Sequence, residues 1–145
     1  EQIYRKIIIE SGIDPLPGVK TLLAALKEAG IQCSIGSSTP TKNIETVIKM
    51  IGLSNHFNAI TAAEDVNNGK PDPEVFLTAA KKINVNPKKC IVIEDAHVGI
   101  EAGLAAKMKV IAVATTHKID QLGRAHLAIQ SLEQVKIKDL YELVG

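Results

Sequence analysis

The sequence predicts an α/β protein built on a parallel β-sheet with helices on both faces. Short aliphatic segments alternate along the chain with helical segments of roughly ten residues, which is the order of elements in βαβ units. Aliphatic runs such as IVI at 91–93 are typical of strands that a parallel sheet buries on both faces. Polar residues directly follow several of these runs, and ligands bind at that edge of a parallel sheet.

The elements from the N-terminus to the first strand follow from local patterns. We predict a helix at 1–11 and a turn-rich connector with two prolines at 12–18. From Val19 onward, apolar residues recur at the i, i+3, i+4, i+7 spacing of an amphipathic helix, and Gly30 ends this helix. The next segment, 31–36, is a short aliphatic run and is predicted to be a strand.

The alternation continues to the end of the chain. Apolar spacing indicates further helices, and aliphatic runs between turn residues indicate further strands. Asp72 is placed to cap one of the helices, with Pro73 at its first position. The predicted helices lie at 44–51, 73–83, 97–107 and 137–144, and the predicted strands lie at 58–61, 90–94, 109–114 and 126–130.

Composition and charge narrow the class of protein. With 145 residues, 46% hydrophobic and 23% charged, the chain has the composition of one soluble globular domain. The formal charge of +1 and the absence of basic blocks argue against a nucleic-acid-binding surface. No apolar stretch approaches the ~20 residues that cross a bilayer. Cys33 and Cys90 lie in predicted strands without metal-ligand spacing, so we expect reduced core thiols in a cytoplasmic protein, with a disulfide between them as the alternative.

Three hydroxyl residues follow the strand at 31–36. Ser37, Ser38 and Thr39 stand immediately before Pro40, which opens a helix. Hydroxyl groups together with the free N–H groups of a helix start can hold an anion. The alternative is that these residues simply cap the helix.

A lysine stands on a restricted backbone in the loop after the strand at 58–61. Lys70 lies between Gly69, which permits unusual backbone angles, and Pro71, which biases Lys70 toward extended conformations. This arrangement suits a cation positioned for phosphate, whereas most lysines in polar loops are solvated. Glu64 and Asp65 in the same loop are expected to be solvated charges.

Two adjacent acids, Glu94 and Asp95, follow the strand at 90–94. Carboxylate oxygens are hard ligands that suit Mg²⁺, which uses one or two carboxylates together with water and substrate oxygens. The alternative makes Asp95 a helix cap and Glu94 a surface acid. Thr115, Thr116 and His117 reach the same edge of the sheet, and we assign no chemistry to His117.

Taken together, these strand ends describe one pocket. Hydroxyl groups and a lysine would hold a phosphate, and the two acids would hold a divalent cation. Phosphoryl transfer needs these parts, because its catalysis consists mostly of positioning the reactants and neutralising oxygen charge.

The ordered set of motifs is similar to that of a known family. The chain resembles the haloacid dehalogenase (HAD) superfamily, and within it the branch of β-phosphoglucomutase-like phosphatases. The resemblance rests on CSIGSST at 33–39, GKPDPEVF at 69–76 and IVIEDAHVGIEAG at 91–103, which match the second, third and fourth motifs of the family in order and spacing. It covers essentially the whole chain and implies a HAD-type Rossmann-like core.

The resemblance implies a role for each candidate residue. Ser37 would donate a hydrogen bond to the transferring phosphoryl group, helped by the backbone N–H of Ser38. Lys70 would bridge that phosphoryl group and the nucleophilic carboxylate. Asp95 would be the main Mg²⁺ ligand from this chain, with Glu94 beside it. The implied substrate is a small phosphorylated metabolite, hydrolysed through a phospho-aspartate intermediate.

The resemblance also implies a division of the chain. Residues 1–11 would be the last helix of a helical cap, residues 12–18 the linker back into the core, and residues 19–145 the C-terminal part of the core domain.

The main departure from the family is its first motif, an apolar strand followed by Asp-x-Asp whose first Asp is the nucleophile. No Asp-x-Asp follows an apolar run in the 145 residues. In the family this strand is central, between the strands assigned here to 31–36 and 90–94, so its absence would leave two unpaired backbone edges. We therefore expect the C-terminal part of a longer enzyme, which needs an N-terminal segment of the same protein to complete its core and is inactive alone.

Three functions stay open at this point. The leading one is a Mg²⁺-dependent phosphatase acting on a small phosphate monoester. The nearest alternative is a β-phosphoglucomutase-like phosphomutase, although Thr39-Pro40-Thr41 stands where β-phosphoglucomutase carries more polar, lysine-containing residues, which favours hydrolysis. A non-catalytic interaction or regulatory module with the HAD fold is favoured by the missing nucleophile and disfavoured by the retained phosphate-binding and acidic residues.

Overall fold

The computed structural model of the chain describes residues 17–145. The predicted helix at 1–11 and most of the connector at 12–18 lie outside the described residues. The described part begins with a turn in which Gly18 has a φ of 88°. A Cβ at Gly18 would lie 2.6 Å from the backbone nitrogen of Glu133, so both the backbone angle and the close approach require glycine here.

All the helices and strands predicted from Val19 onward are present, with ends that differ by a few residues. The strands are mostly shorter than predicted, and the prediction of an α/β fold with parallel strands is confirmed. The helices are α2 (Val19–Glu28), α3 (Thr41–Met50), α4 (Glu74–Lys82), α5 (His97–Ala105) and α6 (Ile137–Val144), and the strands are β1 (Ser34–Gly36), β2 (Ala59–Thr61), β3 (Ile91–Glu94), β4 (Lys109–Val113) and β5 (Leu127–Ile129).

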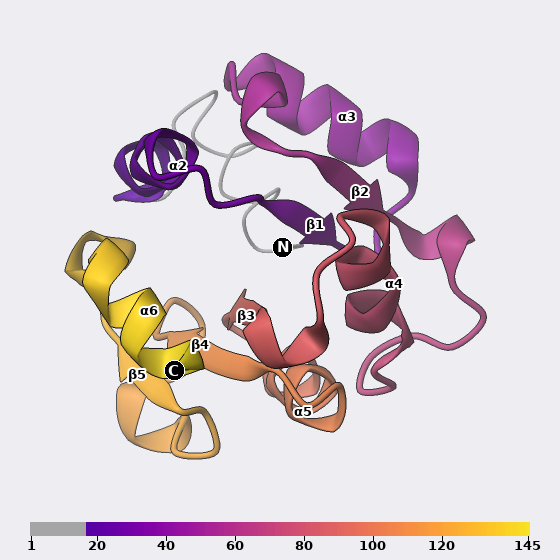
Figure 1. The fold of residues 1–145 in the computed structure, drawn as a ribbon. Helices are drawn as coiled ribbons and strands as arrows, with labels where there is room; N and C mark the ends of the chain where they lie inside the picture. Colours follow the sequence, from indigo (N-terminus) through magenta and orange to yellow (C-terminus); the bar gives the residue numbers. More distant parts are fainter. Residues whose placement is uncertain (1–16) are drawn as a thin grey trace.

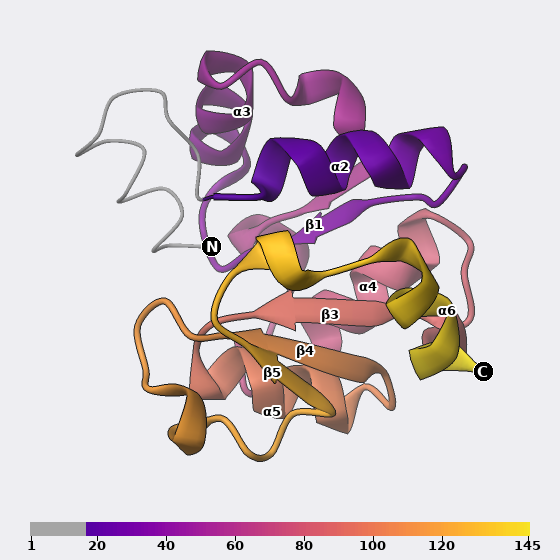
Figure 2. The ribbon, with the colours of Figure 1, turned by 90° about the vertical axis from the view of Figure 1, so that its left-hand side faces the viewer.

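The strands form two separate parallel sheets in the described part of the chain. One sheet has the order β1–β2 and the other has the order β3–β4–β5. Ile35 is in register with Ile60 in the first sheet, and Ile93 is in register with Ile111 in the second. Figures 1 and 2 show β1 and β3 side by side, with no strand formed by residues 17–145 between them. The sheet is therefore divided at the position where the sequence resemblance places an additional central strand.

Apolar clusters lie on both faces of the larger sheet. Residues of α4 and α5 pack with one face of β3 and β4 around Val92 and Val110, which are 6% and 0% exposed. Residues of α2 and α6 pack with the opposite face around Ile111, which is 0% exposed. Burial of each large aliphatic side chain contributes about 1.5–3 kcal/mol to folding, so these two layers stabilise this half of the molecule. The smaller sheet packs against α3 through Ile44 and its neighbours.

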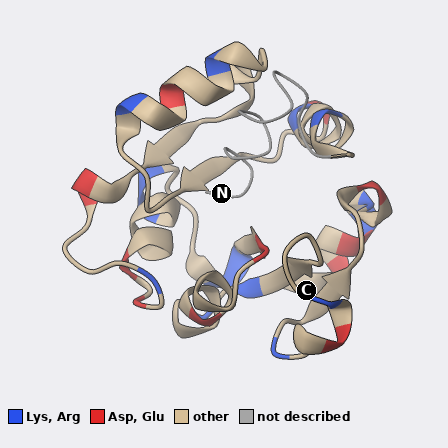
Figure 3. Ribbon diagram, turned by 180° about the vertical axis from the view of Figure 1, so that it is seen from behind, with Lys and Arg blue, Asp and Glu red and all other residues tan. Residues whose placement is uncertain are grey.

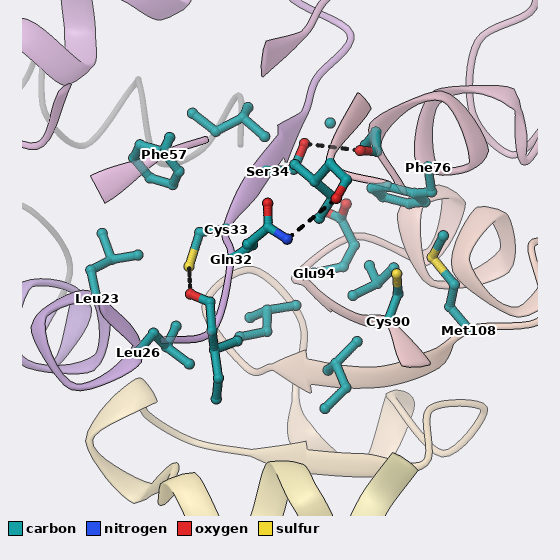
Figure 4. A pocket seen from close by; sticks show the side chains of 18 of the residues that line it. Leu23, Leu26, Gln32, Cys33, Ser34, Phe57, Phe76, Cys90, Glu94 and Met108 are labelled. Carbon is teal, nitrogen blue, oxygen red and sulfur yellow. Dashed lines mark hydrogen bonds between the residues drawn. The ribbon is translucent and has the colours of Figure 1, made fainter. Parts of the chain in front are cut away.

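A cavity of about 860 Å³ is lined by both β1 and β3 and by the helices around them (Figure 4). Most of its lining is aliphatic. Ile93 is 39% exposed, so the prediction of a fully buried strand at 91–93 is wrong at this position. The side chain of Ile93 is exposed because it lines the cavity, where the described residues provide no neighbouring strand.

Both cysteines are free thiols that line this cavity. Each of Cys33 and Cys90 is half-buried, and burial raises the pKa of both thiols. The expectation of unpaired cysteines is therefore confirmed. Among residues 17–145, no helix combines the length and the apolar character that a membrane span needs.

Candidate active site

Ser37 lies at the carboxyl end of β1 and is 1% exposed. Its backbone N–H donates to the carbonyl of Thr61 at 2.9 Å, which extends the pairing with β2 by one residue. Its hydroxyl accepts a hydrogen bond from the N–H of Thr39 at 3.0 Å. Ser37 therefore does not cap α3. The first N–H of that helix, on Thr41, donates to Glu64 Oε1 at 2.7 Å. The hydroxyl of Ser37 keeps its proton available to an anion in the cavity that it lines.

The two acids after β2 are exposed, as expected for solvated charges, and each also accepts hydrogen bonds from neighbouring groups. Glu64 accepts the N–H and the hydroxyl of Thr41. Asp65 Oδ2 accepts the N–H of Ala62 at 2.8 Å and a bond from Lys82 Nζ at 3.2 Å. In each case a backbone N–H is the main cause that lowers the pKa of the carboxyl group. These contacts tie the loop after β2 to α3 and α4.

Lys70 is buried and paired, so the alternative of a solvated loop lysine is wrong. Its Nζ lies 3.1 Å from Glu94 Oε2, and the two side chains are 8% and 6% exposed. The same Nζ lies 5.0 Å from the centre of the Phe76 ring, within the range of a cation–π contact. The loop after β2 and the end of β3 thus meet at one buried ion pair.

Glu94 is likewise not a surface acid. Besides the contact of Oε2 with Lys70, its Oε1 accepts the N–H groups of Asp95 at 3.2 Å and Ala96 at 3.4 Å. Burial is the largest single influence on Glu94 and disfavours its charged form, but the Lys70 ammonium group and smaller favourable contributions together lower the pKa of Glu94 below its ordinary value. A Cβ at Gly99 would overlap the Glu94 carboxylate, so glycine at this position of α5 makes room for it. The sequence signal for this role was the glycine in the motif, which our sequence reasoning left unused.

Asp95 is 9% exposed, and the N-cap of α5 is the following residue, Ala96, which makes no side-chain capping bond. Its Oδ2 accepts long hydrogen bonds from the hydroxyl groups of Thr115 at 3.5 Å and Thr116 at 3.4 Å. Burial raises the pKa of Asp95, and the neighbouring Glu94 raises it further. A cation bound to this carboxylate would offset both effects.

The loop after β4 lies against the start of α5. The rings of His97 and His117 stack with centroids 4.3 Å apart, and Thr116 donates to the carbonyl of Asp95 at 3.3 Å. As the sequence predicts, this loop therefore reaches the same edge of the sheet as the acids.

The structure brings the predicted site residues to one place. Ser37, Glu94 and Asp95 line the same cavity, and Lys70 joins them through its ion pair with Glu94. Ser38 is exposed and does not line the cavity. In residues 17–145 no three His, Cys, Asp or Glu side chains gather as a ready metal site.

The donor chemistry nevertheless fits part of a Mg²⁺ site. Asp95 presents a buried carboxylate at a strand end, beside two hydroxyl groups. Both carboxylate oxygens of Glu94 already receive hydrogen bonds, so Asp95 is the better candidate ligand. One or two protein carboxylates are a usual number for Mg²⁺, which keeps water or substrate oxygens at its other positions.

The sequence of this chain matches that of a known protein family. The family model described as haloacid dehalogenase-like hydrolase matches residues 1–113. The chain is 36% identical over 126 residues to the chloroplastic 5-amino-6-(5-phospho-D-ribitylamino)uracil phosphatase of Arabidopsis thaliana, covering 87% of this chain and 34% of that protein. It is 33% identical over 135 residues to hexitol phosphatase B of Escherichia coli O157:H7, covering 92% of this chain and 61% of that protein.

A solved structure shows the same similarity. The β-phosphoglucomutase of Clostridium difficile superimposes with a TM-score of 0.84 at 36% sequence identity, over 99% of this chain and 62% of that one. The chain thus spans between about a third and two thirds of the length of these relatives.

Proposed function

The chain belongs to the family of haloacid dehalogenase-like hydrolases, and on that premise we propose that it forms the C-terminal part of the catalytic core of a Mg²⁺-dependent phosphatase. The substrate would be a small phosphate monoester. One observation carries the proposal: Ser37, Glu94 and Asp95 line one cavity, and a buried ion pair fixes Lys70 beside them.

Each side chain has a task that its surroundings support. The hydroxyl of Ser37 would donate a hydrogen bond to a phosphoryl oxygen. This hydroxyl accepts a hydrogen bond from the Thr39 N–H, which leaves its own O–H group to act as donor. Lys70 would neutralise phosphoryl charge, since its ammonium group is held in a nearly dry environment where charge interactions are strong. Glu94 would hold Lys70 in place through the contact at 3.1 Å.

Asp95 would hold the Mg²⁺ ion, with Glu94 beside it. When bound, this ion would neutralise charge on phosphoryl oxygens and favour the ionised form of Asp95. The hydroxyl groups of Thr115 and Thr116 would orient the Asp95 carboxylate.

The nucleophile in this proposal comes from a segment that fills the cavity between β1 and β3. In a parallel sheet the backbone groups of alternate residues point to opposite neighbouring strands. Cys33 bonds to Asn58, directly before β2, and Ser37 bonds to Thr61 of β2. The backbone groups of Ser34 and Gly36 therefore point away from β2, toward the cavity. Directly before β3, the carbonyl of Cys90 accepts the N–H of Lys109 in β4, so the backbone groups of Ile91 point toward the cavity from the other side.

An apolar strand in this place would pair with both edges, and an Asp-x-Asp at its carboxyl end would lie among Ser37, Lys70 and Asp95. The first Asp would form the phospho-aspartate intermediate and the second would act as general acid and base. We propose that an N-terminal segment of the same protein supplies this strand. Residues 17–145 alone would then contain part of the active site but would not turn over substrate.

The test compares Mg²⁺-dependent hydrolysis of p-nitrophenyl phosphate by the chain alone and by the chain extended with the reading frame upstream of Glu1. We expect no hydrolysis by the chain alone and clear hydrolysis by an extended protein that begins with an apolar strand and Asp-x-Asp. Hydrolysis by the chain alone would contradict the missing nucleophile. An upstream sequence without this motif would favour the non-catalytic module.

A phosphomutase is the second candidate, because the β-phosphoglucomutase of Clostridium difficile has the same core at 36% identity. A sugar-phosphate assay with the extended protein separates the two activities. Transfer of the phosphoryl group between positions of the sugar indicates the mutase, and release of inorganic phosphate indicates the phosphatase.

A further inference from the structure

The first turn of α4 holds the loop that carries Lys70. Glu74 Oε2 accepts the backbone N–H of Asn67 at 2.9 Å. Glu74 Oε1 accepts the backbone N–H of Asn68 at 3.1 Å and the side-chain amide of Asn68 at 3.4 Å. One carboxylate therefore binds two consecutive backbone N–H groups that lie six and seven residues before it.

The other end of the loop is closed by Asp72. The N–H of Asp72 donates to the carbonyl of Gly69 at 3.1 Å, and Asp72 Oδ1 accepts the N–H of Glu74 at 2.9 Å. Lys70 thus lies in a short loop whose beginning and end are both tied to the start of α4.

The same helix also contacts the end of the Lys70 side chain. Phe76 lies two residues after Glu74, is 8% exposed, and has its ring centre 5.0 Å from Lys70 Nζ. The start of α4 therefore fixes the backbone around Lys70 through Glu74 and the ammonium group through Phe76.

An acid in the first turn of a helix is common, because it interacts favourably with the helix dipole. That role needs no contact outside the helix. The hydrogen-bond partners of Glu74 that define its orientation lie instead in the loop before the helix, on the segment that leads directly to Lys70.

We propose that Glu74 is a positioning residue for Lys70, acting by binding the N–H groups of Asn67 and Asn68 and so holding the Lys70 ammonium group at Glu94. The catalytic consequence of this role rests on the proposed phosphatase function. The structural consequence does not, because it concerns only the loop and its lysine.

The structural part is tested on the chain itself by the rate at which N-hydroxysuccinimidyl acetate acetylates each lysine, measured by peptide mass spectrometry. Glu74→Ala should raise the acetylation rate of Lys70 several-fold, since the ammonium group is no longer held in its buried pair. Glu74→Gln, which keeps one acceptor oxygen, should give an intermediate rate and serves if the alanine variant does not fold.

The matched control is Glu64→Gln. Glu64 also accepts a backbone N–H, but its partner is Thr41 at the start of α3 and not a residue next to Lys70. It should leave the acetylation rate of Lys70 unchanged. An unchanged Lys70 rate in both Glu74 variants would overturn the proposal, as would an equal rise in the Glu64 variant.

The catalytic part is tested by a double-mutant cycle in the extended, active protein. Glu74→Ala should lower kcat about 10- to 100-fold with little change in KM, because a misplaced catalytic group costs on that order. In a Lys70→Ala background it should lower kcat no further, since Glu74 acts through Lys70. An equal loss in both backgrounds would contradict positioning. Absence of any activity in the unmodified extended protein would refute the proposed function instead, and the acetylation rates would still decide the role of Glu74.

Discussion

Two lysines mark the two sides of the smaller sheet, and they differ in burial and in partner. On the outer side of β2, Lys82 Nζ donates to the carbonyl of Ile60 at 2.6 Å and pairs with the exposed Asp65. On the inner side, Lys70 pairs with Glu94 at 3.1 Å and is 8% exposed.

The difference shows which edge is the boundary of the fold. Thr61 bonds to β1, so the Ile60 carbonyl and the Ala62 N–H point away from β1, where Lys82 and Asp65 occupy them. Side chains thus close the outer edge, as natural sheets commonly protect their edges. The inner edges of β1 and β3 instead face a largely aliphatic cavity, which is where we propose that a further strand binds.

Lys70→Met should have the largest effect on stability. It leaves the Glu94 carboxylate buried without its partner, and breaking a buried ion pair costs about 3–5 kcal/mol. Urea denaturation measures this loss in the free energy of unfolding. Adding Glu94→Gln should recover much of it, because the double variant no longer buries an unpaired charge. If Lys70→Met lowers the free energy of unfolding no more than Lys82→Met does, the two edges of the smaller sheet do not differ as described.

Gly99→Ala should have an intermediate effect. The new methyl group would overlap the Glu94 carboxylate and push it away from Lys70, and overpacking of this kind costs about 1–3 kcal/mol. The control is Gly123→Ala, where an added Cβ has no atom within 4 Å. Equal unfolding midpoints for the two variants would show that the space over α5 is not needed by Glu94.

Lys82→Met should have a smaller effect. The lysine is partly exposed, its pair with Asp65 is screened by solvent, and we expect Tm to fall by about 3 °C or less. The informative readout is association, because the Ile60 carbonyl at the outer edge becomes available to another strand. Analytical ultracentrifugation should show more dimer for this variant than for Lys49→Met, a lysine at the end of α3 for which a change should be neutral. Equal association would contradict the edge-protecting role of Lys82.

The smallest effect is expected on lowering the pH. Backbone N–H groups lower the pKa values of Glu64, Asp65 and Glu74, so each stabilises the folded chain when ionised. This stabilisation is present above the ordinary values of 4.5 for Glu and 3.8 for Asp, and is lost as the pH falls through the lowered pKa values. Urea midpoints at about pH 6 and about pH 3 should differ less for a Glu64→Gln, Glu74→Gln variant than for the unmodified chain. An unchanged difference would contradict these pKa shifts.

The sequence was sufficient to predict the order of helices and strands. It also predicted that Ser37, Lys70, Glu94 and Asp95 lie close together. Periodicity is local, and the ends of parallel strands must meet at one edge, so neither needed tertiary detail. The division into two sheets followed only from the family resemblance.

The supporting contacts could not be predicted in the same way. Glu64 bonds to Thr41 and Lys82 to Ile60, pairs that lie more than twenty residues apart, and nothing in the local pattern links their members. The exposure of Ile93 was missed for a related reason, because an aliphatic run indicates burial without showing which neighbour provides it.

Amide hydrogen exchange tests the central claim most directly, since it reads the two edges of the smaller sheet in one experiment. In the chain alone, we predict rapid exchange at Gly36 and Ile93, whose N–H groups face the cavity, and slow exchange at Ala62, whose N–H donates to Asp65. In the extended protein, Gly36 and Ile93 should become protected while Ala62 stays unchanged. If Gly36 and Ile93 exchange as slowly as Ala62 in the chain alone, the inner edges of β1 and β3 are not open, and the central claim is contradicted.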